Sequence, residues 1–329
     1  MSERQPSSSS VQRRVLVTGA GGFIGRKLVA RLEADPAVEH IVATDIRLPP
    51  AQARGARAQW RELDVRDPGA GSALASERID SLVHLASIVT PPPGMSREEM
   101  YAIDVGGTEN VLASCLRAGV KRLIVTSSGA AYGYHADNPE WLEEHHPLRG
   151  NEEFAYSHHK RLVEELLARC RQEHPELVQI VFRLCTVLGE SVRNQITALF
   201  EGRFVLGITG SATPFVFVWD EDVVEVLHRA LWREQSGVFN VAGDGTLTLR
   251  EIARRLGKPY VPIPRGLVRL ALRVGRALHL TQYGPEQVGF LAYRPVLSNR
   301  KLKDEFGYSP KYSSAEAFEK YLAARARAT

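Results

Sequence analysis

The sequence contains few of the residues that mark disulfide-rich, metal-binding and membrane-spanning proteins. Its 329 residues include only three cysteines, Cys115, Cys170 and Cys185, which stand far apart. An odd number of isolated cysteines offers neither a disulfide framework nor the paired spacing of a metal knuckle. We therefore expect a cytoplasmic protein without a metal site. No uninterrupted apolar run approaches the roughly 20 residues that span a bilayer, so we expect no transmembrane segment.

A large excess of one charge is also missing. The chain has 42 Lys and Arg against 38 Asp and Glu, a formal net charge of +4, and its arginines are scattered. This balance is too small to indicate a nucleic-acid partner. The start of the chain, MSERQPSSSSVQRR, has no apolar core of the length that a signal peptide needs, and we expect residues 1–12 to form a disordered tail.

Short apolar runs alternate with helical patterns over the first half of the chain. Strands are predicted at 14–20, 40–46, within 56–65, and at 79–87, 120–128 and 177–189, and helices at 21–34, 97–119 and 152–173. This alternation predicts an α/β protein with a Rossmann-type, doubly wound parallel sheet. It lapses after Gly189. We therefore expect a dinucleotide-binding domain over 13–189 and a smaller, mainly substrate-binding region over 190–329, with a short return to the sheet near 237–246.

The segment VLVTGAGGFIG places three glycines between the first strand and the first helix. Gly19 would permit the tight turn, Gly22 would let the backbone approach a pyrophosphate, and Gly25 would let the helix pack close to the strand. Phosphate oxygens would bind the free N–H groups at the start of the helix, where Phe23 and Ile24 lie. The alternative is a plain glycine-rich turn.

Two aspartates follow later strands. Asp45 ends the second strand, where a carboxylate accepts hydrogen bonds from the adenosine ribose and repels a 2′-phosphate. It favours NAD over NADP, although Arg47 could weaken this preference. Asp64 and Val65 follow the third strand and would hold adenine by a hydrogen bond and an apolar wall. The alternative for Asp64 is a helix cap or turn aspartate.

Tyr156 and Lys160 lie one helical turn apart, on a helix that follows the strand ending in VTSS. A lysine ammonium beside the phenol favours the phenolate, which would lower the pKa of Tyr156 from its reference value of about 10. The positive charge of an oxidised nicotinamide acts in the same direction. A serine hydroxyl could then hold a substrate oxygen while the tyrosine takes or returns its proton.

In the order and spacing of these elements the chain resembles the extended short-chain dehydrogenase/reductases, and more narrowly the NAD-dependent epimerase/dehydratase family. The likeness extends from about residue 13 to 325 and includes VTGAGGFIG, LVHLAS, IDVGGTENVL, VTSSGAAYG, YSHHK, FRLCTVLG and FVFVWDEDVVEVL. It implies an NAD-dependent oxidoreductase or epimerase (an isomerase) that transfers hydride at a secondary alcohol or ketone carbon. We also expect a homodimer with a small-molecule substrate.

The resemblance also assigns roles to residues. Ser128 is expected to be the catalytic serine, with Ser127 as the alternative. Tyr156 would be the acid/base and Lys160 would grip the nicotinamide ribose. The cofactor channel would be lined by Leu85 and Ala86.

Several positions depart from the family pattern. Dehydratases carry Asp-Glu where this chain has Gly129 and Ala130, so we do not expect a dehydratase. The family's usual Asn is replaced by Thr186 in RLCTVLG. The usual Arg before the F-V-x-V strand is missing, because Thr213 and Pro214 stand there. An unpaired diphosphate would lose roughly 1.5–3 kcal/mol, unless an arginine elsewhere in the chain replaces the contact. The candidates are Arg193, Arg203 and Arg294.

Asp104 replaces the Asn of another family motif, with no expected consequence for the reaction class.

The departures leave two substrate classes open: a sugar, free or nucleotide-linked, or an apolar alcohol such as a 3β-hydroxysteroid or a lipid-linked compound. A third alternative is a non-catalytic NAD-binding scaffold or sensor.

In the segment 267–280, arginines recur beside a leucine and valine face. This pattern indicates a helix that contacts a membrane surface, a cover for an apolar pocket, or a solvated surface helix. His158 and His159 are expected to be exposed.

Overall fold

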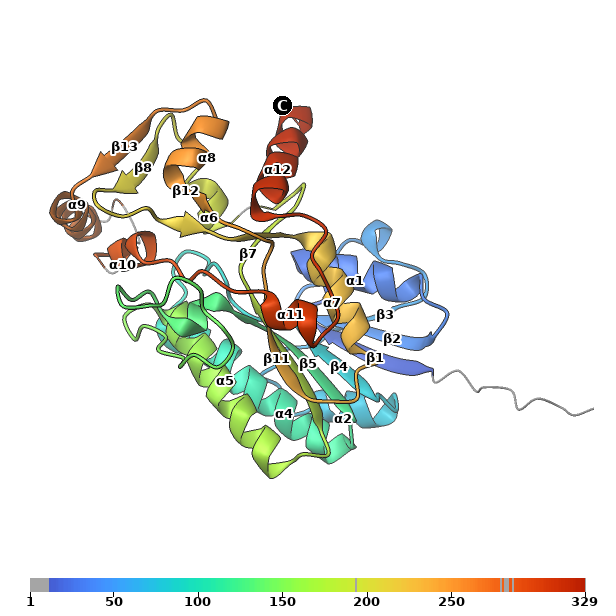
Figure 1. The fold of residues 1–329 in the computed structure, drawn as a ribbon. Helices are drawn as coiled ribbons and strands as arrows, with labels where there is room; N and C mark the ends of the chain where they lie inside the picture. Colours follow the sequence, from blue (N-terminus) through green and yellow to red (C-terminus); the bar gives the residue numbers. More distant parts are fainter. Residues whose placement is uncertain (1–11, 193, 279, 281–283, 286, 329) are drawn as a thin grey trace, which may run out of the picture.

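A seven-stranded sheet forms the centre of the protein (Figure 1). The computed structural model describes residues 12–328 except 193, 279, 281–283 and 286, so the predicted tail lies almost wholly outside the described residues. The strands run in the order β11 (Gly237–Val241), β6 (Val178–Leu184), β5 (Arg122–Ser128), β4 (Ser81–His84), β1 (Arg13–Thr18), β2 (Val38–Asp45) and β3 (Gln59–Glu62). Every neighbouring pair is parallel. The predicted Rossmann-type fold is confirmed.

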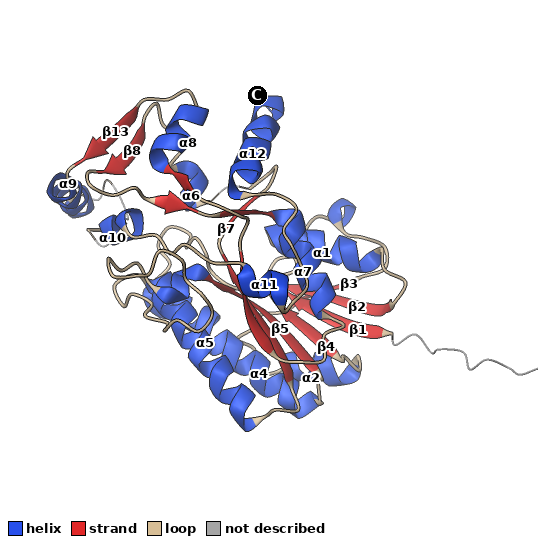
Figure 2. Cartoon of the chain, viewed as in Figure 1, coloured by secondary structure: helices blue, strands red, loops and turns tan. Residues whose placement is uncertain are grey.

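Helices cover both faces of this sheet (Figure 2). One face carries α1 (Phe23–Glu33), α7 (Asp220–Ala230) and α11 (Arg300–Asp304), and the other carries α2 (Ala70–Ser76), α4 (Gly107–Ala118) and α5 (Ala155–Glu173). Successive strand residues point to opposite faces. In β1, Val15 and Val17 therefore pack in the first core, and Leu16 packs in the second. A sheet buried on both sides explains why its strands read as continuous apolar runs.

The predicted helix over 97–119 is helical throughout but not uniform. It begins as α3 (Arg97–Tyr101), capped by Ser96 and Glu99, and passes through the π-helix η2 (Ala102–Gly106) into α4. It ends at Gly119, whose φ of 69° is left-handed. Short π-helical segments occur frequently at functional sites. Here the segment holds Asp104, which is buried.

The C-terminal part of the chain adds three small ribbons. They pair β7 (Thr186–Leu188) with β10 (Phe217–Trp219), β8 (Val205–Ile208) with β13 (Tyr260–Ile263), and β9 (Pro214–Phe215) with β12 (Leu247–Thr248). Around them lie α6 (Gln195–Ala198), α8 (Leu249–Arg255), α9 (Arg265–Ala277), α10 (Gln287–Ala292) and α12 (Ser314–Ala328). Phe215, Phe217, Trp219 and Phe318 form part of a separate core there. Two short 3₁₀ turns, η1 (Ala51–Ala53) and η3 (Gly129–Tyr132), lie in the first half of the chain.

The strand β11 lies in the main sheet, where it pairs with β6, and α7 just before it covers a face of that sheet, although both follow residue 189. The main sheet is thus built from segments far apart in the sequence. The boundary between a dinucleotide domain and a substrate region at 189/190 stays a prediction.

Candidate active site

A cavity of about 470 Å³ lies at the carboxyl edge of the sheet, between the glycine turn and the C-terminal part. Parallel sheets bind ligands at this edge. Its lining includes Gly19, Gly22, Phe23, Ile24 and Gly25 from the first turn, Leu85, Thr126, Ser127 and Ser128 from the strand ends, Tyr156 and Lys160 from α5, and Thr186, Ile196, Phe290 and Arg294 from the C-terminal part.

The glycine turn has the shape that a pyrophosphate needs. Gly19 has a φ of +67°, and a Cβ there would lie 2.7 Å from the Ala86 backbone nitrogen. A Cβ on Gly25 would lie 2.3 Å from the Gly19 carbonyl oxygen. Gly22 precedes α1 without a side-chain cap, so the N–H groups of the first turn have no partner within the helix. Residues 22–25 line the cavity, and free N–H groups at a helix start fit an anionic phosphate.

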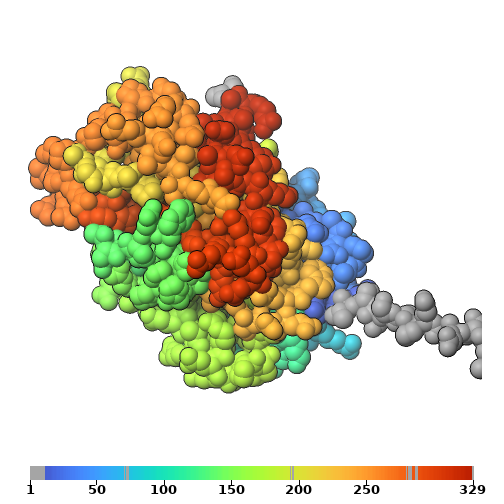
Figure 3. All heavy atoms as spheres, in the orientation of Figure 1, coloured from blue at the N-terminus to red at the C-terminus, as the bar shows by residue number. Residues whose placement is uncertain are grey.

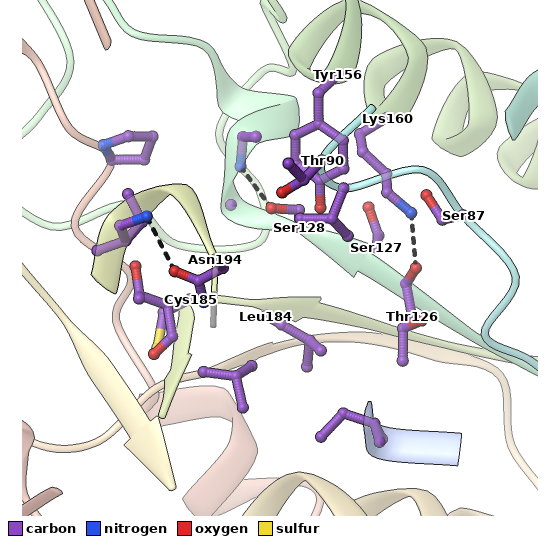
Figure 4. Close-up of a pocket in the computed structure, with 18 of the residues that line it drawn as sticks. Ser87, Thr90, Thr126, Ser127, Ser128, Tyr156, Lys160, Leu184, Cys185 and Asn194 are labelled. Carbon is purple, nitrogen blue, oxygen red and sulfur yellow. Dashed lines mark hydrogen bonds between the residues drawn. The ribbon is translucent and has the colours of Figure 1, made fainter. Parts of the chain in front are cut away.

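Tyr156, Lys160 and Ser128 come together in the cavity (Figure 4). Ser128 is the last residue of β5, and its Oγ accepts a hydrogen bond from the Ala130 N–H at 3.1 Å. Lys160 Nζ donates to the Thr126 carbonyl at 3.1 Å and lies 5.8 Å from the centroid of the Tyr156 ring. The chain thus brings a hydroxyl, a phenol and an ammonium to one point.

Ser157, which the sequence did not single out, fixes the start of α5 against the end of β5. Its hydroxyl donates to the Ala130 carbonyl at 2.6 Å and accepts from the Asn151 N–H at 3.0 Å. Because Ala130 also donates to Ser128, this contact holds Tyr156 in place relative to Ser128. Serine is common in helices, so no sequence signal separated this residue from ordinary ones.

The two adjacent serines have different partners. Ser127 is buried and donates to Glu164 at 2.5 Å, and Glu164 accepts two hydrogen bonds from Nε and Nη2 of Arg183, at 2.9 and 2.7 Å. Ser127 therefore belongs to a buried ionic network. Ser128 instead lies in the cavity beside Tyr156 (Figure 4).

Burial changes the pKa of both helix residues. Desolvation by the protein around the ring raises the pKa of Tyr156, and the nearby Ser128 hydroxyl opposes this rise. Burial lowers the pKa of Lys160, and the charges of Asp104 and Glu164 oppose that decrease. The expectation that Lys160 lowers the pKa of Tyr156 below its reference value is wrong for the protein chain by itself. Desolvation of the phenol dominates, and the ammonium is turned toward Thr126.

The expectation that His159 is exposed is also wrong. The side chain is buried, and its Nδ1 lies 3.3 Å from Oδ2 of Asp104. The other carboxylate oxygen of Asp104 accepts hydrogen bonds at 2.9 Å from the Ser87 hydroxyl and from the Ile88 N–H. Burial tends to raise the pKa of Asp104, but these partners and the nearby Lys160 charge hold it below its usual value. A buried anion thus lies behind Lys160.

The other predicted cofactor residues lie outside the cavity lining. Asp45 accepts a hydrogen bond from the Gly21 N–H at 3.0 Å, which puts its carboxylate beside the glycine turn. Asp64 accepts from the Arg66 N–H at 2.9 Å and pairs with its guanidinium, the contacts of a turn aspartate. Val65 packs in the core beneath α4, and Ala86 packs against the same core.

Arg294 lines the cavity from the C-terminal part of the chain. Its guanidinium lies 4.3 Å from the centroid of Phe215 and 4.7 Å from that of Phe290, and Nη2 donates to Thr186 at 3.3 Å. Nη1 is buried and has no hydrogen-bond partner within the described part of the chain. Burial lowers the pKa of this group. Of the other candidates, Arg203 is exposed outside the lining and Arg193 lies outside the described residues.

Comparison with known proteins gives the family. A model of the NAD dependent epimerase/dehydratase family matches residues 15–242. The uncharacterized protein Rv0501 of Mycobacterium tuberculosis is 27% identical over 314 residues, which cover 94% of this chain and 84% of that protein. The 3beta-hydroxysteroid-dehydrogenase/decarboxylase isoform 2 of Arabidopsis thaliana is 25% identical over 348 residues, which cover 93% of this chain and 60% of that protein.

A solved structure has the same fold. The UDP-glucose 4-epimerase of Thermus thermophilus, in complex with NAD, superposes with a TM-score of 0.73 at 24% identity and covers 96% of this chain and 100% of its own. The family model spans more than half of the sequence. The chain therefore belongs to the NAD dependent epimerase/dehydratase family.

Proposed function

We propose that this protein is an NAD-dependent enzyme that acts at a secondary alcohol or ketone carbon, with Ser128, Tyr156 and Lys160 as its catalytic residues. The observation that carries the proposal is their meeting in one cavity with the glycine turn. A phenol, a hydroxyl and an ammonium at this edge provide the proton handling that such a reaction requires.

The residues of the first turn would hold the pyrophosphate, Asp45 the adenosine ribose and Lys160 the nicotinamide ribose. When bound, NAD supplies the acceptor and donor of the hydride. The Asp45 carboxylate disfavours a 2′-phosphate, which supports NAD rather than NADP. Val65 would contribute an apolar wall near the adenine, whereas the Asp64 side chain is already paired with Arg66.

Tyr156 would take the proton of the substrate hydroxyl on oxidation and return it on reduction, while Ser128 holds the substrate oxygen. Because burial raises the pKa of Tyr156, its phenolate needs a cation close by. The Lys160 ammonium, which donates to Thr126 in the chain alone, would supply that cation together with the positive charge of a bound oxidised nicotinamide. The negative charges of the buried Asp104 and Glu164 favour the protonated form of Lys160.

The substrate that the site supports best is a nucleotide-linked sugar. Arg294 lines the cavity, and its buried Nη1 has no hydrogen-bond partner among the described residues. Such a group fits an anionic diphosphate. Dehydration is disfavoured, because it requires a second acid/base group besides Tyr156. The described lining of the cavity contains no carboxylate or imidazole that could serve as that group. Gly129 and Ala130 line the cavity at the two positions where dehydratases of the family carry Asp-Glu.

An apolar alcohol, such as a sterol or a lipid-linked compound, is the second candidate. Tyr134, Phe154 and Phe290 line the cavity and pack against one another, with ring centroids 5.1 to 5.6 Å apart. Such a wall fits the apolar face of a fused-ring substrate. The similarity to the Arabidopsis 3β-hydroxysteroid enzyme supports this class.

Replacement of Tyr156 tests the mechanism. We expect Tyr156→Phe to lower turnover by about 10²- to 10⁴-fold, while NAD still binds, because only the proton-transferring group is lost. A matched control is Tyr312→Phe, which removes a hydroxyl that accepts a hydrogen bond from Lys320 and lies outside the cavity lining. Undiminished turnover in Tyr156→Phe would show that the assignment is wrong.

A substrate screen separates the two classes. Purified protein with NAD would be incubated with nucleotide-sugars, free sugars and hydroxysteroids, with NADH absorbance and product chromatography as readouts. Product analysis is needed because an epimerase accumulates no NADH. We expect Arg294→Ala to impair a nucleotide-sugar reaction more strongly than a hydroxysteroid reaction. Binding of NAD without turnover of any class would favour the scaffold alternative.

A further inference from the structure

The helix α9 exposes an apolar stripe to water. Leu267, Leu270, Val274 and Leu278 are 58%, 54%, 48% and 61% exposed, although such side chains are usually buried. They recur at intervals of three and four residues and so lie on one face. α9 has no fully buried residue. Exposed apolar groups in a contiguous stripe mark a contact surface.

This stripe is not the side by which α9 packs on the protein. Val268 and Leu272 pack against Ile208 of β8 and against Val288 and Ala292 of α10. Arg265 at the start of the helix bonds the Tyr293 hydroxyl. The helix is thus anchored by one side and lies at the edge of the molecule (Figures 1 and 3). Its stripe of leucines is exposed.

The segment of the chain that contains α9 is basic. Residues 252–285 contain seven Lys and Arg and no Asp or Glu. Within α9, Arg265, Arg269, Arg273 and Arg276 also recur at helical spacing and occupy a different face from the leucines. Arginines beside an exposed leucine face are complementary to a surface that is both apolar and anionic.

The ribbon before α9 continues this character. Leu206 of β8 and Val261 of β13 are register partners, and they are 54% and 36% exposed. Phe204, just before β8, is 52% exposed. The exposed apolar side chains of the C-terminal part therefore gather at the end of the molecule that carries α9.

We propose that α9 docks this protein onto a lipid bilayer with anionic headgroups, lying in the plane of the interface. A short helix with one apolar and one basic face binds bilayers in this way, through buried apolar area and attraction to acidic lipids. Among the described residues, no helix is long and apolar enough to cross a membrane. The docked helix therefore rests on the surface.

Docking would bring the cavity close to the bilayer. α10 contacts α9 through Val288 and Ala292, and its Phe290 lines the cavity. A substrate with an apolar portion could then pass from the bilayer along this wall. The docking proposal itself does not depend on the reaction, because its test measures binding alone.

The test is co-sedimentation of the full chain with phosphatidylcholine vesicles and with vesicles in which about a third of the lipid is phosphatidylglycerol. We expect binding to the anionic vesicles that weakens as salt is added. Leu270→Gln/Val274→Gln removes apolar area without a change in charge, and Arg269→Glu/Arg273→Glu reverses the basic face. Each pair should lower the partition coefficient roughly tenfold or more.

The matched control is Lys121→Glu/Arg169→Glu, which reverses two exposed charges at the amino edge of the sheet and should bind as the wild type does. Thermal unfolding shows that each variant is folded. Absence of vesicle binding, or equal binding by the α9 variants, would overturn the proposal. So would a fall in the sedimentation-velocity mass of Leu270→Gln/Val274→Gln without vesicle binding by the wild type, because the stripe would then contact a second copy of the chain.

Discussion

Asp104 is a charged residue at a position where the family motif has an amide. It is buried, accepts hydrogen bonds from Ser87 and Ile88, and faces His159. Its negative charge favours the protonated form of Lys160. We infer that this substitution helps to keep Lys160 charged inside the protein, where desolvation acts in the opposite direction.

Neutralising that carboxylate should change the pH profile. In Asp104→Asn the pKa of Lys160 falls further, because burial is less strongly opposed. The alkaline limb of kcat should therefore move to lower pH by roughly one unit. Ser87→Ala is the control, since it removes a hydrogen bond to Asp104 but keeps the charge. Equal pH profiles for Asp104→Asn and the wild type would show that the Asp104 charge does not influence the protonation of Lys160.

The carboxylate of Asp45 should determine cofactor preference. Asp45→Asn removes the repulsion of a 2′-phosphate, and we expect the ratio of kcat/KM for NADP to that for NAD to rise roughly tenfold. Glu39→Gln is a matched control, because it removes the same charge at the other end of β2. A similar rise in both variants would indicate a general charge effect.

At the scale of elements, the junction of η2 and α4 depends on one of two adjacent glycines. Both Gly106 and Gly107 have helical dihedral angles, with φ of −61° and −62°. A Cβ on Gly107 would lie 2.6 Å from Cγ2 of Val65, whereas one on Gly106 would meet nothing within 4 Å. α4 can therefore approach the loop after β3 only if residue 107 has no side chain.

The two alanine substitutions should have opposite effects. Gly107→Ala overpacks the contact with buried Val65 and should lower the free energy of unfolding by about 1–3 kcal/mol. Gly106→Ala restricts the unfolded chain without a clash and should raise it by about 0.4–1 kcal/mol. Urea unfolding measures both. Equal effects would mean that the Val65 contact does not limit the approach of α4.

At the scale of the molecule, His84 joins three elements. Its Nδ1 lies 2.8 Å from the Thr18 hydroxyl of β1, and its Nε2 lies 3.1 Å from the Thr108 hydroxyl of α4. Burial, with the Lys160 charge, lowers the pKa of His84 from 6.5 to about 3. Below pH 6.5 the unfolded chain thus binds a proton that the folded chain excludes, and stability falls.

This difference should appear in the pH dependence of unfolding. The His84 contribution is complete above pH 6.5 and is lost as the pH falls toward 3, by about 2 kcal/mol between pH 7 and pH 5. His84→Gln keeps hydrogen-bonding groups but does not titrate. We expect a smaller loss of stability between these pH values in the variant than in the wild type. Parallel curves would mean that His84 is not the group responsible.

Some features of the site could be predicted from local sequence, and others could not. Gly19 and Gly25 were recognisable because the turn itself demands glycine, and Tyr156 and Lys160 because helical spacing puts them on one face. The Asp104–His159 pair was not predictable. Its members lie far apart in the chain, and their burial depends on the packing of η2 against α5.

The sequence by itself determined most of the sheet, the helices α1, α4 and α5 and the residues of the proposed proton-handling site, because strand periodicity and turn chemistry act over a few neighbouring positions. Only the tertiary structure decided the charge state around these residues. Desolvation and Coulomb energies depend on which groups fold against Tyr156 and Lys160. The tertiary structure also decided which of two apolar surfaces lines the cavity and which is exposed to water. The aromatic side chains of Tyr134, Phe154 and Phe290 line the cavity, whereas the leucines of α9 are exposed. Burial requires a partner surface, and only the complete fold provides one.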